Sequence, residues 1–441
     1  DMGRDALVLQ NWKDTSKPPL LGPQTSALPF NQSALYFYLL YPAFVLTSQS
    51  PYSALITNAF LYLSAFAFLL IVFKTNKFLV NLVLLSYFLI AIHPQFVIQS
   101  RFVWNPSFVT PFLLVSLLSL YQLIPKFSRF WLWLFSLTLG AALSLSYSIA
   151  PTFISLILFL PLIFRKKVWQ VYLALGISLF TLNLPTIFFE LRHGFLLTTS
   201  LLTKNSPTQE HLGYLEKLTN LGTFTIGSGN LTFNLVILLL LSIISIFLFF
   251  TSKSIFSRLI SFSTLATIIL SIVLPVSLQP HYIFGHLILF FLLTSLVSLR
   301  IQIPIILIFS LLYLNPTRLT PYFAPAARTY SQMSQCFSQV CQKETQPLFV
   351  AVTSSFHPFH NGPEHRYLLR KAGCNIVDVE TSPDSASSMA LVVDGGNYDP
   401  LKSKFYELDL FGPSTVARSY NCQSNFQVIM LTRATPSPDL P

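Results

Sequence analysis

Long apolar runs recur along the chain, and they constrain its fold more than any other feature. Between residues 51 and 316, runs of about 15 to 23 apolar residues follow one another, and most are joined by short links. Each run is about long enough to cross the roughly 30 Å hydrocarbon core of a bilayer. The predicted spans are 51–73, 78–98, 104–124, 130–148, 150–164, 168–189, 231–251, 258–277, 281–299 and 302–316. The sequence therefore predicts a polytopic α-helical membrane protein with about 10 spans in this chain.

Composition excludes the main alternatives. The 441 residues are 53% hydrophobic and only 10% charged, whereas soluble chains are about 25% charged. Disorder needs low hydrophobicity and high charge, so it is excluded as well. The net charge of +11 lies wholly in residues 1–316, which hold 17 Lys and Arg against 6 Asp and Glu. This placement indicates membrane topology and argues against a nucleic-acid partner.

The basic residues also predict an orientation. If alternate links share a side of the membrane, ten cations and no acidic residue lie on one side, which the positive-inside rule makes the cytoplasm. They are Lys74, Lys77, Lys126, Arg129, Arg165, Lys166, Lys167, Lys253, Arg258 and Arg300. Both chain ends then face outward. An outward N-terminus ahead of many spans predicts that a first span is missing from this chain.

Cysteines give an independent argument for this orientation. All four, Cys336, Cys341, Cys374 and Cys422, fall in the last part of the chain, and none occurs among the first 335 residues. An even number confined to an oxidising compartment predicts up to two disulfides, with three connectivities open. Four buried free thiols are the alternative. The disulfide interpretation places the C-terminal segment outside the cytoplasm.

Three parts of different character follow from these patterns. Residues 1–50 form a first outer loop, whose run SALYFYLLYPAFVL predicts a helix lying along the membrane interface, with a membrane span as the alternative. Residues 51–316 form the transmembrane helical domain, with an outer loop at about 190–230. Residues 317–441 form a small extracytoplasmic α/β domain, because the β-rich runs PLFVAV, ALVVDGG and FQVIMLTR surround the helical pattern PEHRYLLRKAG.

Outward-facing charged residues are few, so each is a candidate for chemistry. Asp1 and Asp5 flank Arg4 in DMGRDA, and a carboxylate there could deprotonate an acceptor hydroxyl or bind a metal. The alternative is a solvated loop that leads into a helix. Arg101, Arg192 with His193, and His281 have the placement that binding of a lipid phosphate requires. Pairing of Arg192 with Glu190, or snorkelling to the interface, is the alternative for that residue.

The order of several short motifs resembles a known family. DMGRDA resembles the acidic motif at the start of the first outer loop of family 39 glycosyltransferases, membrane enzymes of the GT-C fold. The family includes protein O-mannosyltransferases and the aminoarabinose transferases of lipid A. An aromatic LYFYLLYP run follows, then SRFVWNPS, FELRHGF and QPHYIFG, in the order of bacterial members. The resemblance covers roughly the first 320 residues and implies a GT-C-like helical membrane domain.

The resemblance also implies an activity. In this family a polyprenyl-phosphate sugar donates its sugar, with inversion, to a lipid, glycan or protein acceptor at the outer face. Carried over to this chain, Asp1 matches the acidic residue of the first loop, the candidate catalytic base or metal-linked carboxylate, and Arg4 matches the motif arginine. Arg192 and His193 are candidate contacts for the lipid phosphate. Met2 stands where the family often has Glu, and FNQSALYFY holds no second acid. We therefore expect a metal-free base at Asp1, aided by Asp5, and no required cofactor, with a divalent metal as the alternative.

Two other classes of function compete with a membrane glycosyltransferase of the cell envelope. A transporter or flippase of lipid-linked saccharide would share the spans and the outward cations. Ion coupling, however, needs ionisable residues at mid-membrane depth, and the interiors of the predicted spans hold no Asp, Glu, Lys or Arg. A membrane anchor for an assembly or adhesion domain is the third class, for which ten spans are excessive. We predict a multi-pass glycosyltransferase of the cytoplasmic membrane.

Overall fold

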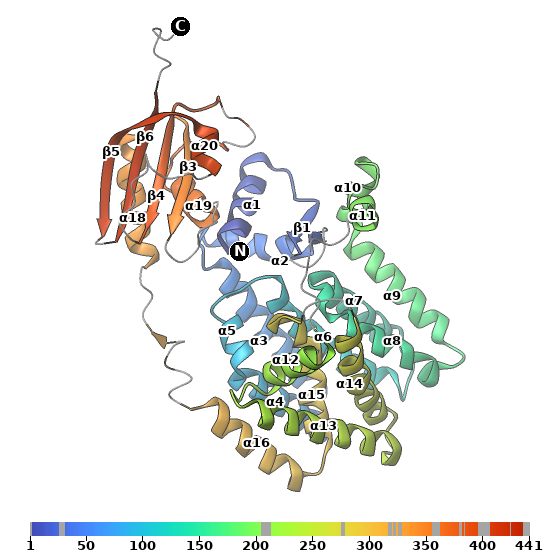
Figure 1. The fold of residues 1–441 in the computed structure, drawn as a ribbon. Coiled ribbons are helices and arrows are strands. Elements are labelled where there is room, and N and C mark those ends of the chain that lie inside the picture. The colour runs from blue at the N-terminus through green and yellow to red at the C-terminus, as the bar shows by residue number, and fades with distance from the viewer. Residues whose placement is uncertain are drawn as a thin grey trace. The chain divides into compact units, whose positions relative to one another are not determined.

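The chain forms two compact units in a computed structural model (Figure 1). The structure describes residues 2–25, 31–203, 213–274, 278–315, 320, 323–324, 329–354, 362–378, 382, 384–395, 406–423 and 425–434. Unit 1 comprises residues 1–17, 48–51 and 325–441, and unit 2 comprises residues 18–47 and 52–324. The first residues of the chain therefore pack with its last part, whereas the sequence pattern predicts residues 1–50 to form one outer loop.

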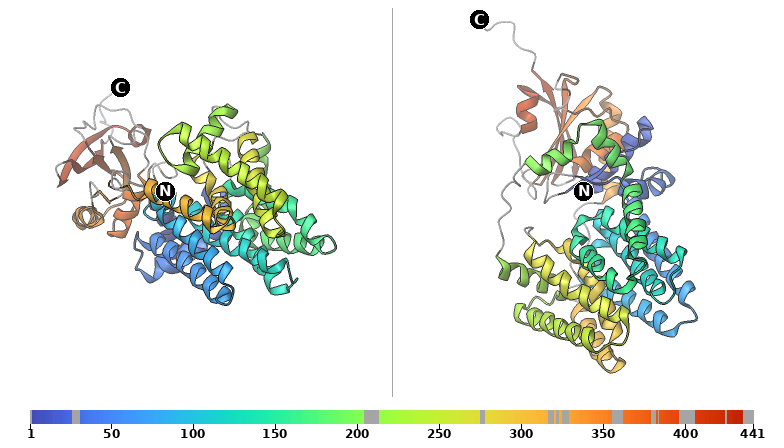
Figure 2. Two further views of the ribbon diagram at one scale, coloured as in Figure 1. Left: turned by 90° about the horizontal axis from the view of Figure 1, so that it is seen from below. Right: turned by 90° about the vertical axis from the view of Figure 1, so that its right-hand side faces the viewer.

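Unit 2 is a bundle of helices joined by short links (Figure 2). Its α-helices are α2 (Leu35–Leu46), α3 (Ser53–Phe73), α4 (Lys77–Ile92), α5 (Pro94–Gln99), α6 (Val109–Leu123), α7 (Arg129–Leu145), α8 (Ala150–Phe164), α9 (Val168–Leu182), α10 (Leu184–Arg192), α11 (Leu196–Thr203), α12 (Tyr214–Ile226), α13 (Leu231–Thr251), α14 (Ile255–Val273), α15 (Phe284–Leu296) and α16 (Leu299–Tyr313). The 3₁₀ helices η1 (Asn105–Phe108), η2 (Tyr147–Ile149) and η3 (Pro280–Ile283), and the strands β1 (Leu21–Gln24) and β2 (Asn31–Ser33), also belong to it.

Helices occupy all ten runs that were predicted to span the membrane. Among the residues that the structure describes, five helical segments are both long and apolar enough to cross a membrane, or six if α9 and α10, bent by 62°, form one span. Five shorter apolar helices, α2, α4, α7, η3 with α15, and α16, accompany them. The structure thus supports a multi-pass helical membrane protein, and the count of ten spans stays a prediction. The run SALYFYLLYPAFVL contains α2, as predicted for a helix there.

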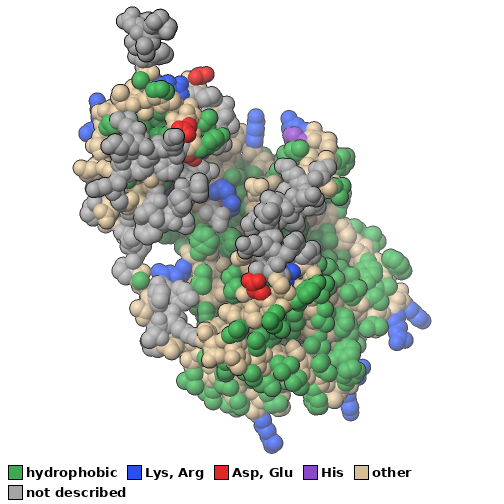
Figure 3. Space-filling view, viewed as in Figure 1, with side chains coloured by type: hydrophobic (Ala, Val, Ile, Leu, Met, Phe, Trp, Pro, Cys, Tyr) green, Lys and Arg blue, Asp and Glu red, His purple; other side chains and the backbone are tan. Residues whose placement is uncertain are grey.

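Capping residues and burial explain how the bundle is ordered. The side chains of Asn76, Asn230 and Ser254 each accept a hydrogen bond from a backbone N–H in the first turn of the following helix, which fixes where α4, α13 and α14 begin. Nearly every residue of α6 and α15 is buried, so these helices form the centre of the bundle. By contrast, most side chains of α3 and α13 are not buried. Their hydrophobic side chains contribute to the largely apolar surface of unit 2 (Figure 3).

Unit 1 is a four-stranded mixed sheet with helices on both faces (Figure 1). The strands β3 (Leu348–Ser354), β4 (Ser388–Asp394), β5 (Ser414–Gln423) and β6 (Phe426–Arg433) lie in the order β3-β4-β6-β5, and only β3 and β4 are parallel. One face packs against α20 (Tyr406–Phe411) through Leu408 and Phe411. The other packs against α18 (Tyr330–Lys343) and α19 (Pro363–Lys371). The three predicted strands and the predicted helix are all present.

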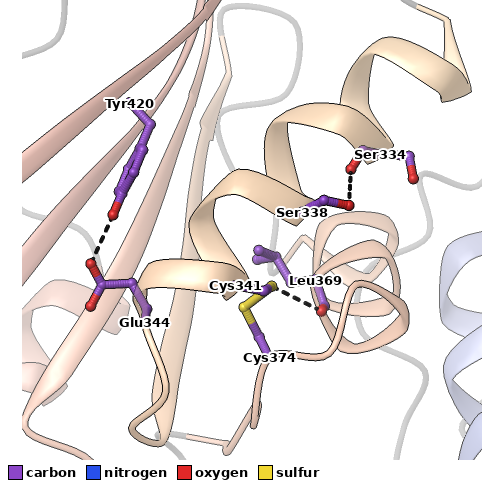
Figure 4. Close-up of a disulfide and its surroundings, with 7 residues drawn as sticks. All are labelled: Ser334, Ser338, Cys341, Glu344, Leu369, Cys374 and Tyr420. Carbon is purple, nitrogen blue, oxygen red and sulfur yellow. Dashed lines mark hydrogen bonds between the residues drawn. A yellow bond between two sulfur atoms is a disulfide. The ribbon is translucent and has the colours of Figure 1, made fainter.

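Two disulfides tie the helices of unit 1 to its sheet and loops. Cys336 bonds Cys422, which joins α18 to β5, and Cys341 bonds Cys374, which follows α19. Figure 4 shows the second bond beside the hydrogen bond of 2.9 Å from Tyr420 Oη to Glu344. All four cysteines are paired, so the disulfide interpretation is confirmed over that of free thiols, and one of its three connectivities is selected.

The N-terminal helix α1 (Met2–Thr15) packs lengthwise against α19 within unit 1. Gln10 donates a hydrogen bond to Tyr367 O at 3.4 Å, and Arg370 forms an ion pair of 2.7 Å with Asp14. Tyr367 and Lys371 both donate to the carbonyl of Gln49, which closes the junction from a third segment. Contacts between positions more than 300 residues apart therefore hold α1 on the C-terminal α/β fold.

Candidate functional site

The predicted acidic motif lies at the start of α1, in unit 1. Asp1 lies outside the described residues. Asp5 is 2% exposed, and its Oδ1 accepts hydrogen bonds from Arg4 at 3.0 Å from Nε and 2.9 Å from Nη2. A buried carboxylate needs such a partner, because desolvation of an isolated charge is costly. The structure therefore brings Arg4 and Asp5 together as an ion pair at the N-terminal end of the helix.

Three 3₁₀ helices meet at one end of unit 2 and bring His281 to a tryptophan. The rings of His281 and Trp104 are 4.4 Å apart between centroids, in an edge-to-face arrangement. Trp104 Nε1 donates to Gln99 Oε1 at 2.7 Å, which fixes the indole. Ser148 Oγ donates to His281 O at 3.5 Å and links η2 to η3. Proline in the first turns of η1 and η3 presets their backbone, so local sequence positions these side chains.

Arg101 lies three residues before Trp104, in the turn between α5 and η1. Its side chain is exposed, and its guanidinium carbon lies 5.8 Å from the centroid of the Phe323 ring. This is a cation–π contact, which leaves the guanidinium hydrogens available to an anion. The two motifs SRFVWNPS and QPHYIFG, far apart in sequence, thus reach the same end of unit 2 through the Trp104–His281 contact.

Lys217 is a buried cation at this end of unit 2, and its sequence pattern does not predict it as a site residue. It is 5% exposed and lies in α12, which contacts η3 and α14. Its Nζ donates to the carbonyl of Leu274, the C-cap of α14, at 2.5 Å. Within the described residues no carboxylate pairs with it, although a buried ammonium is costly without an anion. A Lys in a helix after a polar loop carries no sequence signal of burial, because burial depends on where α14 ends.

Arg192 and His193 lie elsewhere in unit 2, at the end of α10, a helix that contacts α9, α11 and β1. Both side chains are exposed. His193 stacks on Phe189 with ring centroids 4.1 Å apart, and its Nδ1 lies 2.9 Å from Phe189 O. Glu190 does not pair with Arg192. Its carboxylate instead accepts hydrogen bonds from Leu197 N and Thr198 N, at 2.8 and 2.9 Å.

A buried histidine anchors the far end of α12. His93 is fully buried, its Nε2 lies 3.0 Å from Thr225 O, and its Nδ1 accepts from Gln95 N at 3.2 Å. This contact holds the helix that carries Lys217. No three His, Cys, Asp or Glu side chains of the described residues come together in a way that could hold a metal ion.

Comparison with known proteins identifies the fold. No protein-family model matches the chain, and no curated protein matches it in sequence. Two crystal structures of ArnT from Cupriavidus metallidurans are similar over 98% of this chain and 93% of that chain, with 12% sequence identity. The structure bound to undecaprenyl phosphate has a TM-score of 0.60, and the apo structure one of 0.61. The chain has an ArnT-like fold. This likeness supports the GT-C fold that the motif order predicted, and it reaches into both units because it covers nearly the whole chain.

Proposed function

We propose that this protein is a membrane glycosyltransferase, which moves a sugar from a polyprenyl-phosphate donor to an acceptor at the outer face of the membrane. The ArnT-like fold supports the proposal, since one of the two similar structures is bound to undecaprenyl phosphate. The observation that carries it in this chain is the buried ammonium of Lys217 in unit 2. A lipid phosphate is an anion that lies at the membrane interface, where it would supply the charge that Lys217 lacks among the described residues.

The reaction needs a base and a site for the leaving group. The base takes the proton of the acceptor hydroxyl, whose oxygen forms a bond to the anomeric carbon from the side opposite the leaving group. The bond from that carbon to the phosphate oxygen breaks, and its electron pair leaves with the polyprenyl phosphate. Negative charge grows on this phosphate, so cations beside it stabilise the transition state. We assign that role to Lys217, with Arg101 and His281 as further contacts.

Asp1 and Asp5 have different roles in the proposed mechanism. Asp1 is the proposed base, on the strength of its place in the DMGRDA motif. Asp5 is buried and ion-paired, which suits it to holding Arg4 rather than to taking a proton from the acceptor. No cofactor is included in this mechanism. A divalent metal at the first outer loop is the alternative that the experiment below tests with a chelator.

Transfer of radiolabelled sugar from a panel of polyprenyl-phosphate sugars, by purified protein in lipid nanodiscs, tests the proposal. Lys217→Met should raise the KM for the donor by tenfold or more, and Lys217→Arg should restore much of the loss. Because removing a buried lone charge relieves a desolvation cost, the melting temperature of Lys217→Met should not fall. Lys253→Met, which changes an exposed lysine after α13, is the matched control.

Each outcome of this assay decides something. Transfer that survives a chelator supports the metal-free base, and transfer lost to it supports the metal. If Lys217→Met transfers sugar with an unchanged KM, Lys217 does not bind the donor phosphate. If the folded protein binds donors but neither transfers nor hydrolyses any of them, the transporter of lipid-linked saccharide replaces the transferase.

A further inference from the structure

Helices α10 and α11 follow α9, and a tight turn joins them into a short helix–turn–helix segment, named here the α10–α11 hairpin (Figure 1). The described α10 has 9 residues and so rises only about 14 Å, well short of the roughly 30 Å of hydrocarbon that a span must cross. The chain turns after it at Gly194 and Phe195, and the first turn of α11 begins against the end of α10, where Leu197 N and Thr198 N donate to Glu190. This α10–α11 hairpin therefore cannot cross a bilayer by itself.

One face of the hairpin is an exposed apolar stripe. Leu184, Phe188, Leu191 and Phe195 follow one another at intervals of four, three and four residues, and they are 49%, 56%, 63% and 53% exposed. That spacing puts the first three on one face of α10. Leu196 at the start of α11 extends the stripe and is 55% exposed. Apolar side chains gathered on a helix that is too short to span are typical of elements that lie in the membrane interface.

The turn holds a bulky residue in a backbone conformation that such residues rarely adopt. Phe195 has φ +60°, next to Gly194 at φ +63°. Phe195 N donates to Glu190 O at 2.8 Å, and the Glu190 carboxylate caps the first turn of α11. These hydrogen bonds offset the energetic cost of the left-handed backbone conformation at Phe195. Their result is an aromatic ring held outward at the tip of the hairpin, and aromatic residues favour the membrane–water interface.

The same contacts determine the charge of the tip. Glu190 is 8% exposed and turned inward, with Thr198 Oγ1 donating a third hydrogen bond to it at 2.6 Å. Arg192 and His193 are exposed at the same end, next to the exposed Leu191 and Phe195. In the hairpin, Glu190 is therefore buried, whereas Arg192 and His193 are exposed beside the apolar stripe. This pattern complements an anionic lipid surface.

We propose that the α10–α11 hairpin docks in the headgroup layer of the bilayer, with its apolar stripe in the acyl chains and Arg192 and His193 on anionic lipid phosphates. The headgroup layer is the favoured depth, because Arg192 and His193 lie at the tip together with the exposed Phe195. Moving a charged side chain into the hydrocarbon core would cost free energy. The proposal goes beyond the transferase reaction, since it assigns these two residues to lipids of the bilayer rather than to the donor.

The experiment uses the full chain in nanodiscs of phosphatidylcholine, with and without phosphatidylglycerol. All four native cysteines are in disulfides, so a single introduced thiol can be labelled alone with an environment-sensitive fluorophore. Phe195→Cys and Leu191→Cys report on the hairpin, and Ala417→Cys, exposed on β5, is the matched control. The hairpin probes should emit at shorter wavelength than the control. They should also be quenched more by a nitroxide near the lipid headgroup than by one at the end of an acyl chain.

The charge prediction needs a second comparison. Phosphatidylglycerol should increase headgroup quenching of the Phe195 probe, and Arg192→Gln with His193→Gln should abolish that increase. Added inorganic phosphate should not compete, which distinguishes a lipid surface from a free-phosphate site. Aqueous quenching of the hairpin probes equal to that at Ala417 would overturn the proposal. So would quenching strongest at the acyl-chain end, which indicates a broken span, or blue-shifted emission that no lipid quencher reaches, which indicates a protein partner.

Discussion

Replacing Gly3 by alanine tests the packing of α1 on α19 most directly. A Cβ built at Gly3 would lie 2.5 Å from Glu364 N and 2.6 Å from Glu364 Cβ, far inside ordinary contact distance. Backbone atoms cannot move aside as a flexible side chain can, so α1 must shift, and overpacking of this kind costs about 2 kcal/mol. Alanine is the better helix former by about 1 kcal/mol. The net effect of Gly3→Ala is then a loss of about 1 kcal/mol in the docking of α1.

Hydrogen exchange measured by mass spectrometry reports this loss locally. A change of about 1 kcal/mol is about a fivefold change in an opening equilibrium, so the amides of α1 should exchange about five times faster in Gly3→Ala. Gly176→Ala in α9 is the matched control, because a Cβ there meets nothing within 4 Å. Its helix should exchange at the same rate or more slowly. If Gly3→Ala slows exchange in α1 as well, helix propensity outweighs the contact and the close approach to α19 is wrong.

Three further predictions concern other contacts. Replacing Cys341 and Cys374 together by serine opens a loop with a sequence separation of 33, which should lower the free energy of unfolding of unit 1 by about 4 kcal/mol in a denaturant titration. Burial raises the pKa of Tyr367, so the folded state keeps a proton that the unfolded state loses. Thermal melts should show a midpoint that falls as the pH rises above about 10, and less steeply in Tyr367→Phe. Gly285→Ala should lower the melting temperature, because the alanine Cβ would overlap the side chain of Thr152. Adding Thr152→Ala should restore part of the lost melting temperature. If the effects of the two substitutions simply add, the contact between these positions is contradicted.

Apolar length was sufficient to predict most of unit 2. Each of the ten runs contains a helix, because a single apolar segment away from water can form its backbone hydrogen bonds within itself only as a helix. In unit 1 the strands β3, β4 and β6 are buried and rich in Val, Leu and Ile, so their sequences predict them. Strand β5 was missed because STVARSYNCQ lies at the sheet edge, is mostly exposed, and shows little apolar alternation.

The site residues that the sequence missed depend on long-range placement. Lys217 differs from other lysines of the chain only because α12 lies against the end of α14, which no local pattern reveals. The contact between Trp104 and His281 joins motifs that the sequence could order but not bring together. For Glu190 the sequence offered Arg192 as a partner at the spacing of two, whereas the turn at Gly194 made the amides of α11 the nearer donors.

The proposed function assigns different steps to Asp1 and to Lys217, and the variants Gly3→Ala and Lys217→Met test these steps separately. The DMGRDA motif begins α1, which the contacts to Tyr367 and Arg370 hold within unit 1. Lys217 and His281 belong to unit 2 and are held by helices of the bundle. Under the proposed function, loosening α1 from α19 disturbs the base and not the donor phosphate. Gly3→Ala should therefore lower kcat with little change in the KM for the donor, whereas Lys217→Met raises that KM. Equal effects of both variants on the KM for the donor would contradict these separate assignments.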